Sequence, residues 1–221
     1  MRRPVSGPKL WAWRAASSMS FRIRAFAFVL ATAAFAYQAA RAELLSGTLE
    51  LDPSKTLIEF RLPAALHTTH GIFKLEHGTI RGDLGTSEAS GSIVVDAKSG
   101  DSGLGLRDSR MKSSVLEVQK YPEIIFTPRH VSGQLGKDGQ VQAKLEGVLT
   151  IHGAGHQITL DVRGRITGDD LVATTHFSVP YVEWGMEDPS LVFTVEKQVD
   201  IDIATEGHIV WTGDPLRSSH K

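Results

Sequence analysis

The sequence contains no cysteine among its 221 residues, and this absence excludes several kinds of chemistry. A cysteine nucleophile, a thiolate zinc site, an iron–sulfur cluster and a disulfide all require the thiol group. The acylated cysteine of a bacterial lipoprotein is missing for the same reason. Any functional site must therefore be built from oxygen, nitrogen and apolar groups.

Acidic residues are missing from the first 42 positions, which carry seven lysine and arginine residues. Of the 24 basic residues in the chain, 17 lie beyond this segment, against 25 acidic residues, a net charge of −8. An acidic domain gains no counterion release from nucleic acid and is not attracted to anionic lipid headgroups. We therefore exclude nucleic acid and a charged membrane surface as primary partners.

Long apolar runs are also scarce. The run Ala25–Ala36 has about a dozen residues, whereas a membrane-spanning helix needs about 20. It follows a basic segment and precedes Ala40-Arg41-Ala42, which is the order of a secretory signal peptide. We expect residues 1–42 to be this signal, with Met19 as a candidate for the true start. The mature chain would then be periplasmic, without a stable membrane anchor. The alternative is that the apolar run forms a core helix.

Beyond the signal, apolar and polar residues alternate with a period of two, which is typical of strands. The clearest case is Ile158–Ile166, which is apolar at its even positions and polar at its odd ones. Seven further segments share the pattern: Leu57–Leu62, Phe73–Ile80, Ser92–Ala97, Glu123–Val131, Val141–Ile151, Leu171–Val179 and Phe193–Ile203. About eight strands separated by short turns favour an antiparallel sandwich or barrel.

Only one segment after the signal has a helical pattern. It covers Asp108–Val118, with Asp108 as the expected N-cap and an apolar face. It should end before Pro122, since the residue preceding a proline avoids the helical region. The predicted fold is therefore an all-β antiparallel barrel of about eight strands over residues 43–211, with this helix across one end. Residues 212–221 are polar and are expected to form a flexible tail.

Three motifs between about residues 49 and 207 carry a resemblance to a known family. They are Arg107–Val118 with Lys120–Phe126, Gly147–Gly153 with Gln157–Val162, and Leu51-Asp52-Pro53 with Ile58-Glu59-Phe60. These motifs resemble those of the YceI-like family of periplasmic polyisoprenoid-binding proteins. The resemblance implies a lipocalin-like barrel whose elongated apolar cavity holds an isoprenoid-type lipid, polyprenyl or quinone-like, with no cofactor and no catalysis.

If the sheet closes into a barrel, the apolar side of each strand must face inward. The residues expected to line a cavity and bind the ligand are Ile58, Phe60, Phe73, Leu75, Ile93, Val95, Met111, Phe126, Leu149, Ile151, Leu160, Phe177, Val179 and Phe193. The same parity turns Leu62, Ile124, Ile158, Val162 and Val195 inward. Met111 and the phenylalanines at 60, 126 and 177 are expected to contact the apolar chain. The alternative is a barrel filled by interdigitating side chains.

Two features could shape the mouth of such a cavity. Arg107 and Arg110 form a basic spot beside the expected helix start, and they could hold a phosphate or pyrophosphate headgroup. Alternatively, both arginines form ion pairs at the barrel rim while Asp108 caps the helix. The loop Tyr181–Ser190 departs from the family pattern, and its Tyr, Trp and Met could contribute to the mouth.

Histidines and carboxylates offer weaker candidate sites. A three-residue hairpin loop could bring His152 and His156 opposite one another, but a metal needs a third or fourth ligand and no acidic residue lies in this turn. We expect surface and capping roles for both. Glu183, Glu187 and Asp188 lie in one loop, which does not provide the opposed carboxyl groups of a glycosidase.

The expected function is therefore lipid binding, and two alternatives stay open. One is a periplasmic stress or redox accessory protein that acts through its surface on a membrane cytochrome or quinone system. The other is a small hydrolase with an unrecognised site, although the sequence has no nucleophile elbow and no phosphate-binding loop. The closely spaced glycines of Gly100–Gly105 are interpreted as a flexible turn. A homodimer formed through an edge strand also stays open.

Overall fold

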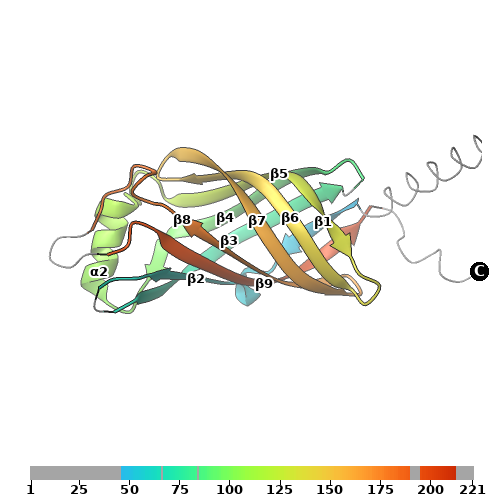
Figure 1. The fold of residues 1–221 in the computed structure, drawn as a ribbon, viewed down its shortest axis with the longest axis horizontal. Coiled ribbons are helices and arrows are strands. Elements are labelled where there is room, and N and C mark those ends of the chain that lie inside the picture. The colour runs from blue at the N-terminus through green and yellow to red at the C-terminus, as the bar shows by residue number, and fades with distance from the viewer. Residues whose placement is uncertain (1–45, 66, 84, 190–194, 213–221) are drawn as a thin grey trace, which may run out of the picture. The chain divides into compact units, whose positions relative to one another are not determined.

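The computed structural model describes residues 46–65, 67–83, 85–189 and 195–212. In these residues, nine strands form one antiparallel sheet that closes on itself, because β3 also pairs with β4 (Figure 1). The strands are β1 (Ser46–Leu51), β2 (Leu57–Leu62), β3 (Thr69–Asp83), β4 (Glu88–Asp101), β5 (Glu123–Leu135), β6 (Gln140–Ile151), β7 (Ala154–Thr167), β8 (Asp170–Val179) and β9 (Val199–Trp211). The predicted all-β antiparallel barrel with one short helix is confirmed.

β1 and β2 together occupy one position in the barrel, so that nine strands fill eight positions. Both pair with β3 on one side and with β9 on the other. The 3-10 turn η2 (Pro53–Lys55) separates them, since Pro53 has no N–H to donate to a neighbouring strand. The sequence pattern did not predict β1, because five of its six residues are half-buried and show no alternation.

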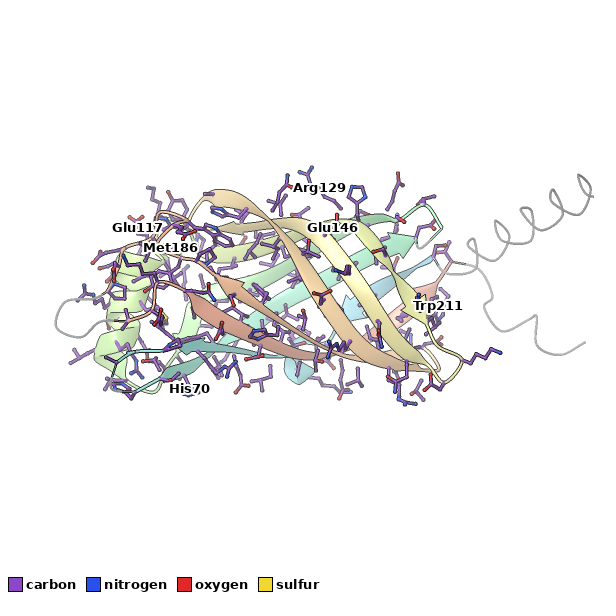
Figure 2. All side chains as sticks on the ribbon, viewed as in Figure 1. His70, Glu117, Arg129, Glu146, Met186 and Trp211 are labelled. Carbon is purple, nitrogen blue, oxygen red and sulfur yellow. The ribbon has the colours of Figure 1, made fainter. Side chains whose placement is uncertain are left out.

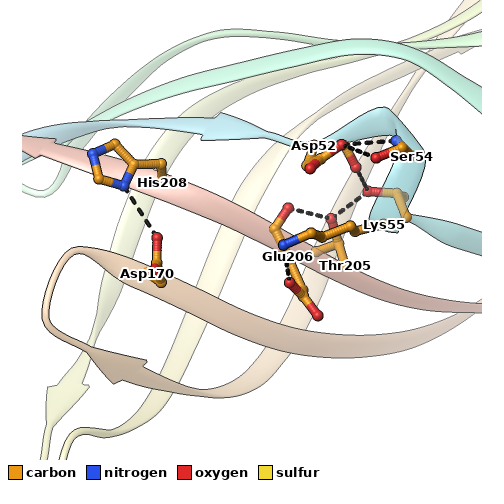
Figure 3. Close-up of polar contacts among 8 residues, drawn as sticks. Asp52, Ser54, Lys55, Asp170, Thr205, Glu206 and His208 are labelled. Atoms are coloured by element: carbon orange, nitrogen blue, oxygen red, sulfur yellow. Dashed lines mark hydrogen bonds and ion pairs between the residues drawn. The ribbon is translucent and has the colours of Figure 1, made fainter.

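Polar contacts hold this interruption against β9 (Figure 3). The Asp52 carboxylate accepts hydrogen bonds from the Ser54 backbone N–H at 2.9 Å and from the Ser54 hydroxyl at 2.6 Å. The bond from the hydroxyl keeps the pKa of Asp52 below its ordinary value. Lys55 Nζ lies 2.8 Å from Glu206 Oε2 on β9. The break between the two strands is therefore a defined turn tied to its neighbour.

Seven of the eight predicted strand segments lie within β2 to β8, but the last, Phe193–Ile203, is misplaced. β9 begins at Val199 and continues to Trp211, while residues 190–194 lie outside the described residues. The sequence Ala204-Thr205-Glu206-Gly207-His208 has few large apolar residues, so the alternation fades there. The strand continues because β8 and β1 supply hydrogen-bonding partners along it.

The end of the barrel that contains Trp211 is filled with side chains. Figure 2 shows Trp211 at the end opposite to Met186. The buried residues there are Leu171, Ala173 and Ile209, with Leu49, Val141, Val162, Ile166 and Trp211 packed against them. Val162 points inward as its parity predicted, but it packs into this core. The barrel is therefore closed at this end by apolar packing.

A short helix covers the other end (Figure 1). α2 (Gly105–Arg110) continues into the π-turn η3 (Met111–Val115). The predicted helix start at Asp108 is wrong, since α2 begins at Gly105 with Leu104 as its N-cap residue. The Asp108 side chain does not cap the helix because it accepts hydrogen bonds from the backbone N–H and the hydroxyl of Ser102, in the loop before it.

Some predictions fall on residues that the structure does not describe. The signal peptide 1–42, with its candidate start at Met19, lies outside the described residues, and so do residues 213–221 of the predicted tail. Thr212, the first residue of that tail, donates its backbone N–H to Ser46 O at 2.9 Å and is therefore paired with β1. Within the described ranges, no helix is long and apolar enough to cross a bilayer.

Candidate ligand-binding cavity

A cavity of about 400 Å³ lies inside the barrel toward the end that α2 covers. Its volume falls within the range of about 300–1,000 Å³ that is typical of small-molecule sites. Every strand from β2 to β9 contributes to its wall, together with α2, η3 and the loop after β8. The barrel is thus hollow at this end, and the alternative of a completely filled interior is wrong.

Twelve of the fourteen predicted lining residues border this cavity. They are Ile58, Phe60, Phe73, Ile93, Val95, Met111, Phe126, Leu149, Ile151, Leu160, Phe177 and Val179. Leu75 is buried and pairs with the lining residue Val95, but it does not itself line the cavity. Phe193 lies outside the described residues. Contact of these side chains with a ligand stays a prediction.

Three glycines, on β3, β4 and β6, make room for the large side chains of the wall. A Cβ on Gly71 would lie 2.3 Å from the Phe60 ring, and a Cβ on Gly147 would lie 2.7 Å from the Phe126 ring. A Cβ on Gly100 would lie 2.6 Å from the Met111 methyl group and 2.7 Å from the Phe73 ring. These side chains therefore lie flat against the backbone, which leaves the centre of the barrel open.

Arg107 borders the cavity at the α2 end. Its Nε donates to Ser102 Oγ at 2.7 Å, its Nη2 to Ser102 O at 2.8 Å and its Nη1 to Thr69 Oγ1 at 3.3 Å. The Ser102 hydroxyl in turn donates to the Asp108 carboxylate, and this bond holds the pKa of Asp108 below its ordinary value. Since the partners of the guanidinium are neutral oxygens, Arg107 brings a positive charge to the mouth of an apolar cavity.

Arg110 lies beside it and also borders the cavity. Its Nη2 is 3.2 Å from Glu187 Oε1 in the loop after β8, and the two side chains are 31% and 50% exposed. A pair this exposed contributes little stability. Of the rim ion pairs predicted for both arginines, the structure therefore shows one for Arg110, while Arg107 bonds to hydroxyl and carbonyl groups instead.

A family model for the YceI-like domain matches residues 49–207, which include every residue that lines the cavity. The chain belongs to the YceI-like domain family. A search of curated proteins gives no match.

Two solved structures share the fold of this YceI-like barrel. BcnA of Burkholderia cenocepacia is 17% identical, with a TM-score of 0.60 over 71% of this chain and 98% of BcnA. A polyisoprenoid binding domain from Saccharophagus degradans, described as implicated in plant cell wall breakdown, is 15% identical, with a TM-score of 0.59 over 73% of this chain and 98% of that domain. At these identities, the likeness establishes the fold of the barrel.

The loop that follows β8 of the YceI-like barrel closes part of the mouth. Tyr181 and Met186 are buried and border the cavity. The Tyr181 hydroxyl donates to Glu196 O at 2.9 Å, and burial, with added repulsion from Asp188 and Glu196, raises the pKa of Tyr181 to about 12. The phenol is therefore neutral and its ring acts as apolar wall.

Trp184 in the same loop is half-buried and packs against the main hydrophobic core of the YceI-like barrel. Its ring stacks on that of His156 at the start of β7, with 3.9 Å between the ring centroids and an interplanar angle of 4°. This contact fixes the loop to the barrel wall. Tyr181 and Met186 thus shape the mouth as the sequence suggested, whereas Trp184 holds the loop in place.

The three-residue loop that could have brought His152 opposite His156 is not formed. The β6–β7 connection is a two-residue turn at His152 and Gly153, and β7 pairs His156 with Leu149. His152 has a φ of 51°, and its Nε2 is hydrogen-bonded to the Glu117 carboxylate. Among the described residues, no three histidine or acidic side chains cluster as a metal site would require.

Sequence reasoning missed Thr69, Ser102 and Glu187 as polar groups of the mouth. The sequence predicts a flexible turn for Gly100–Gly105, yet Gly100 belongs to β4 and Ser102 is hydrogen-bonded to both Arg107 and Asp108. The available signal was the cluster of hydrogen-bonding residues directly before a helix that carries Arg107. Arg107 bonds to Thr69 of β3, and Arg110 bonds to Glu187 of the β8–β9 loop. The periodicity of a single segment does not reveal such contacts between segments.

Proposed function

We propose that the protein binds an isoprenoid-type lipid, polyprenyl or quinone-like, in the barrel interior, and that it carries or sequesters this lipid without catalysis. The observation that carries the proposal is the apolar cavity, which is closed at the Trp211 end and bordered by the two arginines at the other. The similarity to a polyisoprenoid binding domain supports the ligand class.

The energetics of the cavity suit a carrier. Each methylene group transferred from water to an apolar wall contributes about 0.8 kcal/mol. A lipid comes from a membrane, however, whose interior is as apolar as the cavity. The free energy of moving the lipid chain between the membrane and the cavity is therefore small. A small difference in the free energy of the lipid in these two environments decides whether it is taken up or released.

The two arginines suit the polar end of such a lipid. Arg107 and Arg110 border the mouth, and Arg107 presents its charge on neutral partners. A guanidinium group donates hydrogen bonds to phosphate, pyrophosphate or carbonyl oxygens. We infer that the headgroup lies at the α2 end while the chain extends toward the filled end of the barrel.

We place this activity in the periplasm because residues 1–42 have the order of a secretory signal. N-terminal sequencing of the secreted protein should find Glu43 at its start. Retention of residues 19–42 in the secreted material would contradict the proposed processing.

Solvent extraction of the protein purified from its native host, followed by mass spectrometry, tests the ligand. We expect an isoprenoid lipid in the extract, and we expect the delipidated protein to take up a quinone or a polyprenol supplied in detergent. Arg107→Gln should lower retention of a polyprenyl phosphate more than that of the uncharged polyprenol. A protein that contains no lipid and takes up neither compound would refute the proposed function.

A further inference from the structure

Two neighbouring leucines lie exposed at the α2 end of the barrel. Leu104 is 53% exposed and Leu106 is 85% exposed, the largest value for any large apolar side chain in the part of the chain that the structure describes. Scattered exposed apolar residues are ordinary on a protein surface, and Val172 on β8 and Val210 on β9 are examples here. Two exposed leucines only two positions apart, at the end of the barrel where an apolar cavity opens, are a more specific arrangement.

The orientation of α2 explains which side chains face outward. Arg107, Arg110 and Met111 border the cavity, since residues three and four positions apart share one face of a helix. Leu106 and Ser109 are exposed, and Arg110, four positions after Leu106, lies beside it on the helix.

Hydrogen bonds tie this helix to the barrel, so that the leucines project from an ordered turn. The Asp108 carboxylate accepts from the Ser102 N–H at 2.9 Å, and Ser102 directly follows β4. Arg107 joins the same turn to Thr69 of β3. The exposed leucines are therefore presented at a defined place on the rim.

The charge near these leucines differs in sign from that of the rest of the mature chain. Arg107, Arg110 and Lys112 lie within six residues, against Asp108 alone in that stretch, and Glu187 faces Arg110 from the β8–β9 loop. Basic residues beside exposed apolar ones are typical of segments that lie in the interface of a phospholipid bilayer. Residues 43–221 as a whole carry a net charge of −8, so the basic character is local to this end.

We propose that the α2 end of the barrel is a transient docking surface for a phospholipid bilayer. Leu104 and Leu106 enter the interfacial region of the bilayer while Arg110 and Lys112 lie near its phosphate groups. The proposal rests on the proposed lipid-binding function, and it adds a route by which the lipid reaches the cavity. An apolar chain then passes from the bilayer into the cavity at the same end without crossing water.

The test compares transfer from vesicles with loading from detergent. Vesicles of phosphatidylcholine, with or without phosphatidylglycerol, contain a dansyl-labelled isoprenol, and its transfer into the secreted, delipidated protein is followed by fluorescence. The Leu104→Ser/Leu106→Ser variant should take up the probe from vesicles about tenfold more slowly than the unmodified protein. Its uptake from detergent and its thermal unfolding should match the unmodified protein, since both leucines are exposed. The Val172→Ser/Val210→Ser variant is the matched control and should transfer at the normal rate.

Three outcomes would count against the docking surface. Normal transfer by the leucine variant would overturn it, and so would an equal loss in the valine control. Loss of binding to a partner protein with unchanged transfer from vesicles would assign the leucines to that partner instead. Failure of the unmodified protein to load the probe from detergent refutes the lipid-binding function itself, which distinguishes the two failures.

Discussion

A missing methyl group at Gly100 makes room for two side chains of the cavity wall. The three nearest heavy atoms to a Cβ at this position belong to the flexible side chains of Met111 and Phe73. We expect Gly100→Ala to push both into the cavity, to reduce the amount of retained lipid and to lower the free energy of unfolding by about 1–3 kcal/mol. Lipid extraction and urea unfolding measure the two effects. Gly105→Ala is the control because a Cβ there meets nothing within 4 Å, and equal lipid loss in both variants would contradict the explanation.

Larger side chains on the cavity wall provide a second test. A tryptophan needs more space than the phenylalanine that it replaces at position 60, 126 or 177. In the hollow part of the barrel, each Phe→Trp change should narrow the cavity and reduce retained lipid with only a modest loss of stability. In a filled core, the same change would cost about 1–3 kcal/mol and displace no lipid. Retained lipid is measured by mass spectrometry for each variant, and unchanged content in all three would refute their contact with the ligand.

At the scale of the element, one carboxylate anchors α2. The hydrogen bond from the Ser102 hydroxyl holds the pKa of Asp108 below its ordinary value, so the ionised carboxylate stabilises the fold above its unfolded pKa. That contribution is lost as the pH falls through the lowered pKa. The stability difference between the wild-type protein and Asp108→Asn should therefore be largest near neutral pH and shrink below about pH 4. Urea unfolding across this range measures it.

A double-mutant cycle separates this contact from other effects of the charge. Ser102→Ala and Asp108→Asn share one hydrogen bond, so their combined effect at neutral pH should be smaller than the sum of the two single effects. Additive effects would show that Asp108 stabilises α2 by another route.

The elements also show which parts of the fold could be predicted from the sequence. Alternation identified β2 to β8 and placed Ile58, Phe60 and Phe126 correctly on the inner face, because each strand buries one side. It failed where long-range pairing decides the structure. β9 extends through a polar stretch because its neighbours supply hydrogen bonds, and the bulge after Leu75 depends on the register with β4.

The candidate site also has a part that local alternation predicts and a part that depends on long-range contacts. Its apolar wall could be predicted from parity, whereas its polar mouth could not. The mouth joins Thr69 of β3, Ser102 after β4, Arg107 of α2 and Glu187 of the β8–β9 loop. Each belongs to a different segment, and only closure of the barrel brings them together. The spaces at Gly71 and Gly147 are also contacts between strands and leave no trace in the period of one segment.

For the whole molecule, the filled end determines how much of the C-terminus the barrel needs. Trp211 packs against the core of Leu171, Ala173 and Ile209, and Thr212 bonds to Ser46 of β1. Truncation after Thr212 should leave the melting temperature unchanged. Truncation after Val210 removes Trp211 and should lower the melting temperature by several degrees, because it exposes this core. Circular dichroism measures both, and equal melting temperatures would show that Trp211 contributes nothing to closing the end.

The same filled end determines how a linear ligand can enter and leave the barrel. In a barrel that is filled at one end, a linear ligand must leave through the same opening by which it entered, and in the reverse orientation. The core of Leu171, Ala173 and Ile209 fills one end, and α2 lies at the other. The part of a ligand that enters last is therefore the first to leave. In the proposed binding mode, an acceptor of the lipid therefore meets its polar head before its tail.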